Sequence, residues 1–117
     1  MSPYVMPGLK DITVNLVAPI KKQPIDRILN IVTEEFGVTV SEIQGKTRDR
    51  RIIDARQIIC HIMVVRMRLT LKYTGIHALG GRDHTTVIHS IRMFKNMYET
   101  DDAYREKADR AIDRLKI

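Results

Sequence analysis

The chain has 117 residues, of which 44% are hydrophobic and 29% charged, so it is long enough for one globular domain and too short for two ordinary ones. Its formal net charge of +6 favours an anionic partner. The single cysteine, Cys60, excludes an internal disulfide, and no signal segment or transmembrane run is evident. We therefore expect a cytoplasmic protein in which Cys60 is a buried, inert thiol.

The first 23 residues are punctuated by prolines and show little commitment to regular structure. Residues 11–17 alternate apolar and polar side chains as a strand does, but no partner strand is evident. The alternatives are a flexible arm and a strand that pairs with another molecule. We predict a flexible N-terminal arm over residues 1–23 and a folded domain over residues 24–117.

The domain is predicted to open with two helices. Pro24 suits the first position of a helix, and Gly37 suits the position after its end. Apolar residues recur between them at helical spacing: Ile25, Ile28, Leu29, Val32 and Phe36. Thr39 and Glu42 have the spacing of a capping box, which predicts a second, short helix that Gly45 ends.

A basic loop follows at residues 46–51, which read KTRDRR. From Lys46 to Lys72, eight basic residues stand against Asp49 and Asp54, a pattern typical of proteins that bind a phosphate backbone. The alternative is a solvated charged face.

A long helix is predicted from Ala55 to about Leu71. Asp54 and Gln57 have the spacing of a cap and its reciprocal partner at its start. Apolar residues cover much of the helix circumference, so we expect this helix to be central. His61 on this helix is expected to be an interior residue whose polar groups have partners, and not a ligand.

The last third of the chain is predicted to hold three helices. A short one covers residues 72–79, the Gly80-Gly81 pair forms a turn, and a longer helix runs from Asp83 to Glu99. Thr100 or Asp101 caps the final helix, whose apolar stripe is Tyr104, Ala108, Ala111 and Leu115. The predicted fold class is all-α, a helix-turn-helix bundle of about five to six helices.

Residues 80–87, GGRDHTTV, combine a sharp break with a polar helix start. One glycine can take a positive φ, and the Asp83 carboxylate can cap the helix that follows. His84, Thr85 and Thr86 then place donors, acceptors and a methyl group at a helix tip, which is the part of a helix-turn-helix that enters the DNA major groove.

This octapeptide resembles the signature of the DNA-binding C-terminal domain of DnaA, the bacterial replication initiator. The resemblance covers residues 24–97, where short helices, a basic loop, a long helix and the double-glycine turn follow in the order of that family. It implies that a loop arginine enters the minor groove while the residues after the glycines read bases in the major groove. Aligned on the Arg56-Gln57 pair, the minor-groove arginine is Arg48.

The resemblance thus implies two sets of DNA-contacting residues. The base-reading residues are Arg48, Asp83, His84 and Thr85. The candidates for backbone contact are Lys46, Arg50, Arg56, Gln57, Arg82, Thr86 and His89. A charged guanidinium suits a narrow minor groove, a threonine methyl can contact thymine, and an aspartate can accept from cytosine.

Several of these residues also have plainer interpretations. Asp83 can act as a cap alone, Arg50 and Arg51 can be solvated, and His89 can pack in the core. The sequence also departs from the family. Residues 73–79 lack the family's Ile-Gly order and are one residue longer or out of register, which leaves the docking of this helix and the bound sequence open. Asp49 and Asp54 stand where the family is mostly neutral or basic, which should weaken backbone attraction.

No catalytic residues, metal site or cofactor are predicted. His84 and His89 are five residues apart, off the i, i+4 spacing of helical metal ligands, and the chain has no phosphate-binding loop of the Gly-x-x-x-x-Gly-Lys-Ser/Thr type. An enzyme is therefore not expected.

The predicted function is sequence-specific binding of double-stranded DNA at A/T-containing, DnaA-box-like sites, without ATPase activity, in replication initiation or its regulation. We expect a stand-alone factor that binds DNA as a monomer, associates with the nucleoid of a bacterial or phage-infected cell, has no membrane partner and works beside a replication protein. The alternative is a protein-interaction adaptor or transcription regulator that keeps the fold. A third possibility is non-specific DNA packaging, which would show a steep salt dependence without sequence preference.

Overall fold

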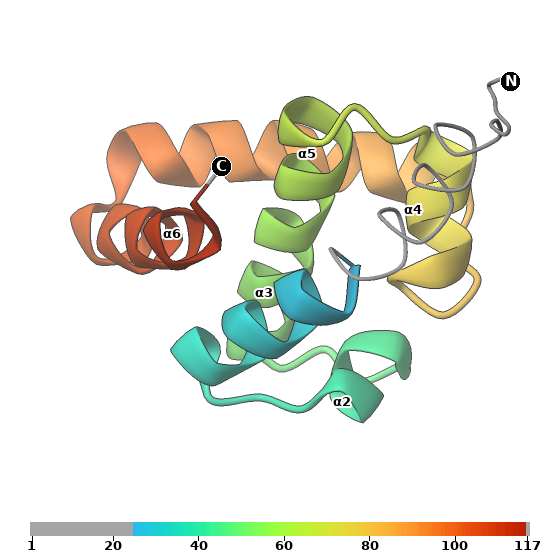
Figure 1. Ribbon diagram of the computed structural model, residues 1–117, viewed down its shortest axis with the longest axis horizontal. Helices are drawn as coiled ribbons and strands as arrows, with labels where there is room; N and C mark the ends of the chain where they lie inside the picture. The colour runs from blue at the N-terminus through green and yellow to red at the C-terminus, as the bar shows by residue number, and fades with distance from the viewer. Residues whose placement is uncertain (1–24, 117) are drawn as a thin grey trace, which may run out of the picture.

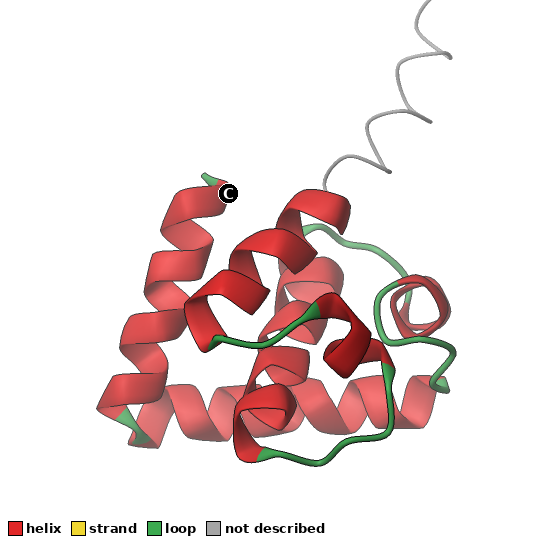
Figure 2. Ribbon diagram, turned by 90° about the horizontal axis from the view of Figure 1, so that it is seen from below, coloured by secondary structure: helices red, strands yellow, loops and turns green. Residues whose placement is uncertain are grey.

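The computed structural model describes residues 25–116, and all regular structure in this range is helical, which confirms the predicted fold class (Figure 2). The predicted arm over residues 1–23, with its alternating stretch 11–17, and the predicted helix start at Pro24 lie outside the described residues.

The helices follow the predicted order (Figure 1). A helix over residues 25–36 ends at Gly37, which adopts a φ of +68°. It is followed by α2 (Val40–Gln44), α3 (Arg50–Cys60), the π-helix η1 (His61–Arg66), α4 (Leu71–His77), α5 (His84–Thr100) and α6 (Asp102–Leu115).

Two of the predicted caps are confirmed. Thr39 Oγ1 accepts from the Glu42 amide at 3.1 Å, and the Glu42 carboxylate accepts from the Thr39 amide at 2.9 Å, which completes the capping box of α2. Asp101, one of the two predicted candidates, caps α6 by accepting from the Tyr104 amide at 3.1 Å.

The predicted start of the long helix is wrong. α3 begins at Arg50, one turn earlier, and its N-cap is Asp49, whose carboxylate accepts from the Arg51 amide at 2.9 Å. Asp49 lacks a glutamate or glutamine three residues on, so the capping-box pattern favoured Asp54 instead. A cap needs only its own side-chain oxygen, and the reciprocal partner is optional.

The predicted end of the long helix is also wrong. The helix continues from α3 into η1, where the Met67 amide donates to the Ile62 carbonyl at 2.8 Å, and it ends at Arg66 instead of near Leu71. The chain then turns through Arg68, which has a φ of +59°. No glycine marks this left-handed residue, so the sequence carries no stop signal there.

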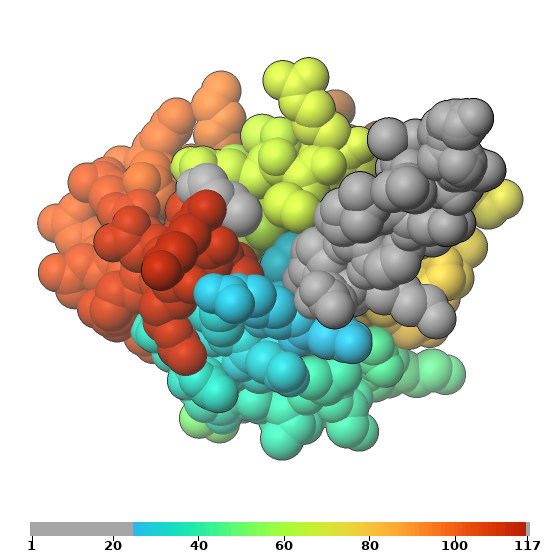
Figure 3. Space-filling view, viewed as in Figure 1, coloured from blue at the N-terminus to red at the C-terminus, as the bar shows by residue number. Residues whose placement is uncertain are grey.

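The core lies where α3 and η1 cross α5, and it is largely aliphatic. Cys60 is buried in it as predicted, and burial raises the pKa of its thiol to about 12. On one face, α6 lies beside the helix over residues 25–36 (Figures 1 and 3). There the Glu35 carboxylate pairs with Arg110 at 3.1 Å and with Arg114 at 3.0 Å.

Candidate nucleic-acid interface

The turn between α4 and α5 is built from two left-handed glycines. Gly80 has a φ of +75° and Gly81 a φ of +98°. The sequence analysis predicted a positive φ for one glycine of the pair, and both adopt it. The Gly75 carbonyl in α4 accepts from the amides of Gly81 and Arg82 at 2.9 and 3.0 Å. These bonds fasten the turn to the helix that precedes it.

The turn is also held by close backbone packing. A Cβ at Gly75 would lie 2.1 Å from the Arg82 carbonyl oxygen, and one at Gly80 would lie 2.5 Å from the Gln44 carbonyl oxygen. Both glycines therefore allow approaches that any side chain would prevent. Residues 73–79 are the segment that departs from the family's Ile-Gly order. Within it, Ile76 is 47% exposed, so it is Gly75 that packs against the turn.

α5 begins immediately after this turn with an exposed polar tip. The Asp83 carboxylate caps the helix, accepting from the Thr86 amide at 3.1 Å and from the Thr86 hydroxyl at 3.2 Å. The hydrogen bond from the Thr86 amide lowers the pKa of Asp83. His84, Thr85 and Thr86 are exposed, while Val87 behind them is buried and anchors the helix.

Two arginines hold the basic loop against the rest of the domain. Arg56 donates from Nε to the Ile43 carbonyl at 2.9 Å and from Nη2 to the carbonyls of Glu42 and Gly45 at 3.0 and 2.9 Å. Arg82 also donates to the Gly45 and Ile43 carbonyls. These carbonyls belong to the last turn of α2 and to its C-cap residue Gly45, so the two guanidiniums cap the end of this helix.

The loop and the α5 tip border one groove of about 540 Å³. The loop side supplies Lys46 and Arg48, and the α5 side supplies Thr86 and His89. The groove is further lined by Ile53, Arg56, Gln57, Arg82, Ser90 and Met93. Of the predicted base-reading residues, Arg48 thus lines the same groove as Thr86 and His89 of α5, while Asp83, His84 and Thr85 do not line it.

The groove is electropositive. Among its described lining residues, Lys46, Arg48, Arg56 and Arg82 are cations and none is a carboxylate. Burial lowers the pKa of Arg56, and the nearby charges of Arg82 and Arg48 lower it further. Like charges gathered this closely favour an anion between them, and the polyanionic backbone of a nucleic acid is such an anion.

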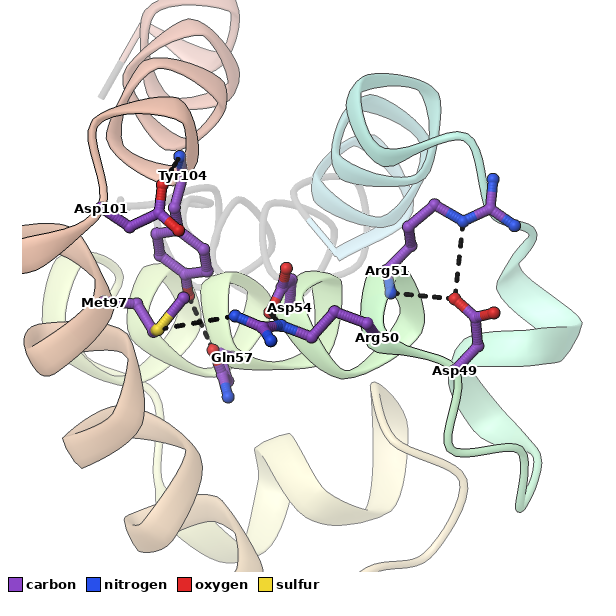
Figure 4. A network of polar contacts seen from close by, with 8 residues as sticks. All are labelled: Asp49, Arg50, Arg51, Asp54, Gln57, Met97, Asp101 and Tyr104. Atoms are coloured by element: carbon purple, nitrogen blue, oxygen red, sulfur yellow. Dashed lines mark hydrogen bonds and ion pairs between the residues drawn. The ribbon is translucent and has the colours of Figure 1, made fainter.

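Four of the predicted backbone-contacting residues have side chains that bind elsewhere in the domain: Arg50, Arg56, Gln57 and Arg82. Figure 4 shows Arg50 and Gln57. Gln57 is 6% exposed, and its Oε1 accepts from the Tyr104 hydroxyl at 2.9 Å. Arg56 is 8% exposed and is committed to the α2 carbonyls. Because α3 begins at Arg50, neither residue lies at the helix N-terminus where the sequence analysis had placed it.

Arg50 extends along α3 and does not line the groove. Its Nε donates to Asp54 at 3.2 Å, and its guanidinium approaches the Met97 sulfur at 3.9 Å (Figure 4). The two acids that depart from the family therefore have local roles: Asp49 caps α3 and Asp54 pairs with Arg50. His89 is exposed and lines the groove, so the core alternative for it is wrong.

Ser90 and Met93 line the groove although the sequence analysis did not name them. They follow Thr86 at i+4 and i+7, so the helical period alone would have placed them on the same face as Thr86. His61, by contrast, stacks on Phe94 with ring centroids 3.9 Å apart, away from this groove.

Residues 25–116 contain no cluster of three or more metal-ligating side chains, and none of their helices is long and apolar enough to span a bilayer.

Comparisons with known proteins identify the family. The family described as Bacterial dnaA protein helix-turn-helix matches residues 25–93, more than half of the chain. Three similar proteins, each called chromosomal replication initiator protein DnaA, are from Gloeothece citriformis, Mycoplasma capricolum and Streptococcus thermophilus. The first is 32% identical over 97% of this chain and 26% of its own length.

The other two relatives are each 34% identical to this chain. The match to the Mycoplasma protein covers 73% of this chain and 19% of that protein. The match to the Streptococcus protein covers 80% of this chain and 20% of that protein. The chain thus spans about a quarter or less of the relatives it matches. The matched family is one of DNA-binding domains and is not a catalytic family. The double-glycine turn, the capped helix tip and the matching family together place the chain in the helix-turn-helix family of the bacterial replication initiator DnaA.

Proposed function

We propose that the chain binds double-stranded DNA in a sequence-specific manner at A/T-containing, DnaA-box-like sites, as a monomer, in replication initiation or its regulation. In this proposal Arg48 enters the minor groove, while Asp83, His84 and Thr85 contact base edges in the major groove. The phosphates are contacted by Lys46, Thr86 and His89, and no ATPase activity is involved. We also propose that the chain associates with the nucleoid through its DNA binding and works there beside a replication protein.

The observation that carries the proposal is the groove shared by the basic loop and the α5 tip. Lys46 and Arg48 lie on one side of it and Thr86 and His89 on the other. A helix tip in a major groove and an arginine in the adjacent minor groove need this arrangement, because the two contacts lie on one side of the duplex. The exposed His84 and Thr85 leave their polar groups available to bases.

Four predicted phosphate contacts are assigned a smaller part: Arg50, Arg56, Gln57 and Arg82. Arg50 binds Asp54 and Gln57 binds Tyr104, while Arg56 and Arg82 both donate to carbonyls at the end of α2. We propose that Arg56 acts on DNA mainly through its charge and through the loop it holds in place.

The test is a fluorescence-anisotropy titration with a DnaA-box duplex and a scrambled duplex at two salt concentrations. The box should be preferred, and affinity for both duplexes should fall with salt. Thr85→Ala should lose about 1–3 kcal/mol of that preference, as expected for one good base contact. Equal, weak binding to both duplexes would instead favour the adaptor, and equal binding with a steep salt slope would favour packaging.

The minor-groove role is tested with a matched pair of variants. Arg48 lines the groove, whereas Arg51 is an exposed arginine whose Nε faces Asp49 at 3.5 Å and which does not line it. Arg48→Ala should weaken box binding clearly more than Arg51→Ala does. If both substitutions have the same effect, only the total charge matters and the minor-groove assignment is wrong.

A further inference from the structure

A second groove, of about 400 Å³, lies between η1, α5 and α6. Its floor is aromatic: His61 stacks on Phe94 at 3.9 Å between ring centroids, and Phe94 stacks on Tyr98 at 5.4 Å. Its walls are the apolar side chains of Val65, Ile91 and Ile112. Val65 is 50% exposed, and among the described residues only Ile76 is another exposed large hydrophobic residue.

The floor of this apolar groove is held rigidly. The Tyr98 hydroxyl donates to Asp109 at 2.6 Å, and Arg105 lies over the Tyr98 ring, 5.5 Å from its centroid. Burial and the charge of Arg66 lower the pKa of His61 to about 4, so its ring is neutral at pH 7. Aromatic side chains fixed before binding lose little entropy when a partner docks on them, which is typical of binding hot spots.

The rim of the apolar groove is mainly basic. Arg66, Arg92 and Lys95 stand on it with one acid, Glu99. The groove extends along α5 from Ile91 to Glu99, about 12 Å at 1.5 Å per residue, which matches roughly two turns of a docked helix. We propose that the apolar groove docks an amphipathic helix of a partner protein, with apolar side chains on one face and carboxylates flanking them.

The basic charges of the rim favour this occupant over two others. Residues 1–24 of the chain carry three lysines and one aspartate, so they would bring like charge to the rim. A second copy of the chain would bring a net charge of +6 to it. A partner helix with carboxylates beside its apolar face complements both the floor and the rim.

The apolar groove and the groove beside the basic loop lie on different sides of α5. The apolar groove is lined on α5 by Ile91, Phe94, Lys95 and Tyr98. The groove beside the basic loop is lined on α5 by Thr86, His89, Ser90 and Met93. At about 100° per residue, the centres of the two sets lie about 140° apart around the helix. A partner helix can therefore dock while DNA is bound, so the domain would hold a second protein at its DNA site.

The proposal is tested with a designed, fluorescein-labelled peptide of about four helical turns, with leucines at i, i+3, i+4 and i+7 and glutamates elsewhere. A reference peptide has lysine in place of every glutamate. The acidic peptide should bind the full-length chain at least about tenfold more tightly than the lysine peptide. Amide chemical shifts should change chiefly in η1 and around Phe94 and Tyr98. Equal affinity of the two peptides, or shifts elsewhere, would overturn the proposal.

Two exposed apolar residues provide a matched control. Val65→Asp places a carboxylate in the apolar groove, while Ile76→Asp makes the same change on α4, outside the groove, at a residue of similar exposure, 47% against 50%. Val65→Asp should reduce the affinity for the acidic peptide at least about tenfold, and Lys95→Glu should reduce it about three- to tenfold. Ile76→Asp should leave this affinity nearly unchanged.

Binding of box DNA separates this proposal from its rivals. Neither Val65→Asp nor Lys95→Glu should reduce the preference for box over scrambled duplex. If these substitutions reduce the affinity for box DNA as strongly as the affinity for the acidic peptide, the apolar groove belongs to the nucleic-acid surface and the proposal is wrong. If the chain dimerises in sedimentation and Val65→Asp abolishes the dimer, the occupant is a second copy.

Discussion

Gly75→Ala gives the sharpest test of how the helix-turn-helix is assembled. Gly75 lies inside α4, and in an ordinary helix interior this change stabilises a protein by about 1 kcal/mol. Here the new Cβ would lie 2.1 Å from the Arg82 carbonyl oxygen, whereas ordinary contacts begin at 3.4 Å. The two backbones must therefore separate by about 1.3 Å. We expect the sign of the effect to be reversed.

The magnitude follows from the contacts that this separation disturbs. Overpacking of this kind costs about 1–3 kcal/mol, and each hydrogen bond lost contributes about 0.5–1.5 kcal/mol. The bonds at risk run from the amides of Gly81 and Arg82 to the Gly75 carbonyl. After the gain in helix propensity, the net loss in unfolding free energy should be about 2–4 kcal/mol. Box affinity should fall as well, because the α5 tip is displaced.

Urea denaturation followed by circular dichroism measures this loss, with Gly81→Ala as the control. A Cβ at Gly81 meets nothing within 4 Å, so that variant has only the strain of its φ of +98°, about 1–2 kcal/mol. If the Gly75→Ala protein is as stable as the wild type or more so, the close approach of α4 to the turn is not the constraint that the structure indicates.

Two further predictions concern the core and its pH dependence. Tyr104→Phe should cost about 1–3 kcal/mol in urea denaturation, because it leaves the buried Gln57 oxygen without a donor. Tyr98→Phe should cost less, since its partner Asp109 is exposed; equal losses would argue against the buried bond. Burial and Arg66 lower the pKa of His61 from 6.5 to about 4, so the unfolded chain binds this proton first as pH falls. Unfolding free energy should therefore drop between pH 6.5 and 4, less steeply in His61→Phe, and identical slopes would contradict it.

The sequence predicted the features that depend on local rules. The Thr39–Glu42 box, the positive φ of the double glycine and the Asp83 cap each follow from a few adjacent residues. The apolar stripe of α6 was correct for the same reason, since a helical period identifies the buried face without knowledge of what covers it.

The features that the sequence did not predict depend on tertiary contacts. Arg56 is adjacent to Gln57 in a charged stretch, yet both side chains point inward because the α2 carbonyls and Tyr104 supply partners that are distant in sequence. The end of η1 was missed because Arg68 adopts a left-handed conformation without being glycine or asparagine. The packing role of Gly75 depends on where Arg82 lies, which no local pattern encodes.

The basic loop is pinned at both ends and exposed in between. Arg56 and Arg82 fix its start through the Gly45 carbonyl, and Asp49 fixes its end by capping α3. Residues 46–48 between these pins are all exposed. If the loop reads DNA as proposed, exchanging these three exposed residues should change the DNA preference while the contacts that fix the two ends of the loop are kept. Replacing Arg56 or Arg82 should instead free the start of the loop, because each donates to the Gly45 carbonyl.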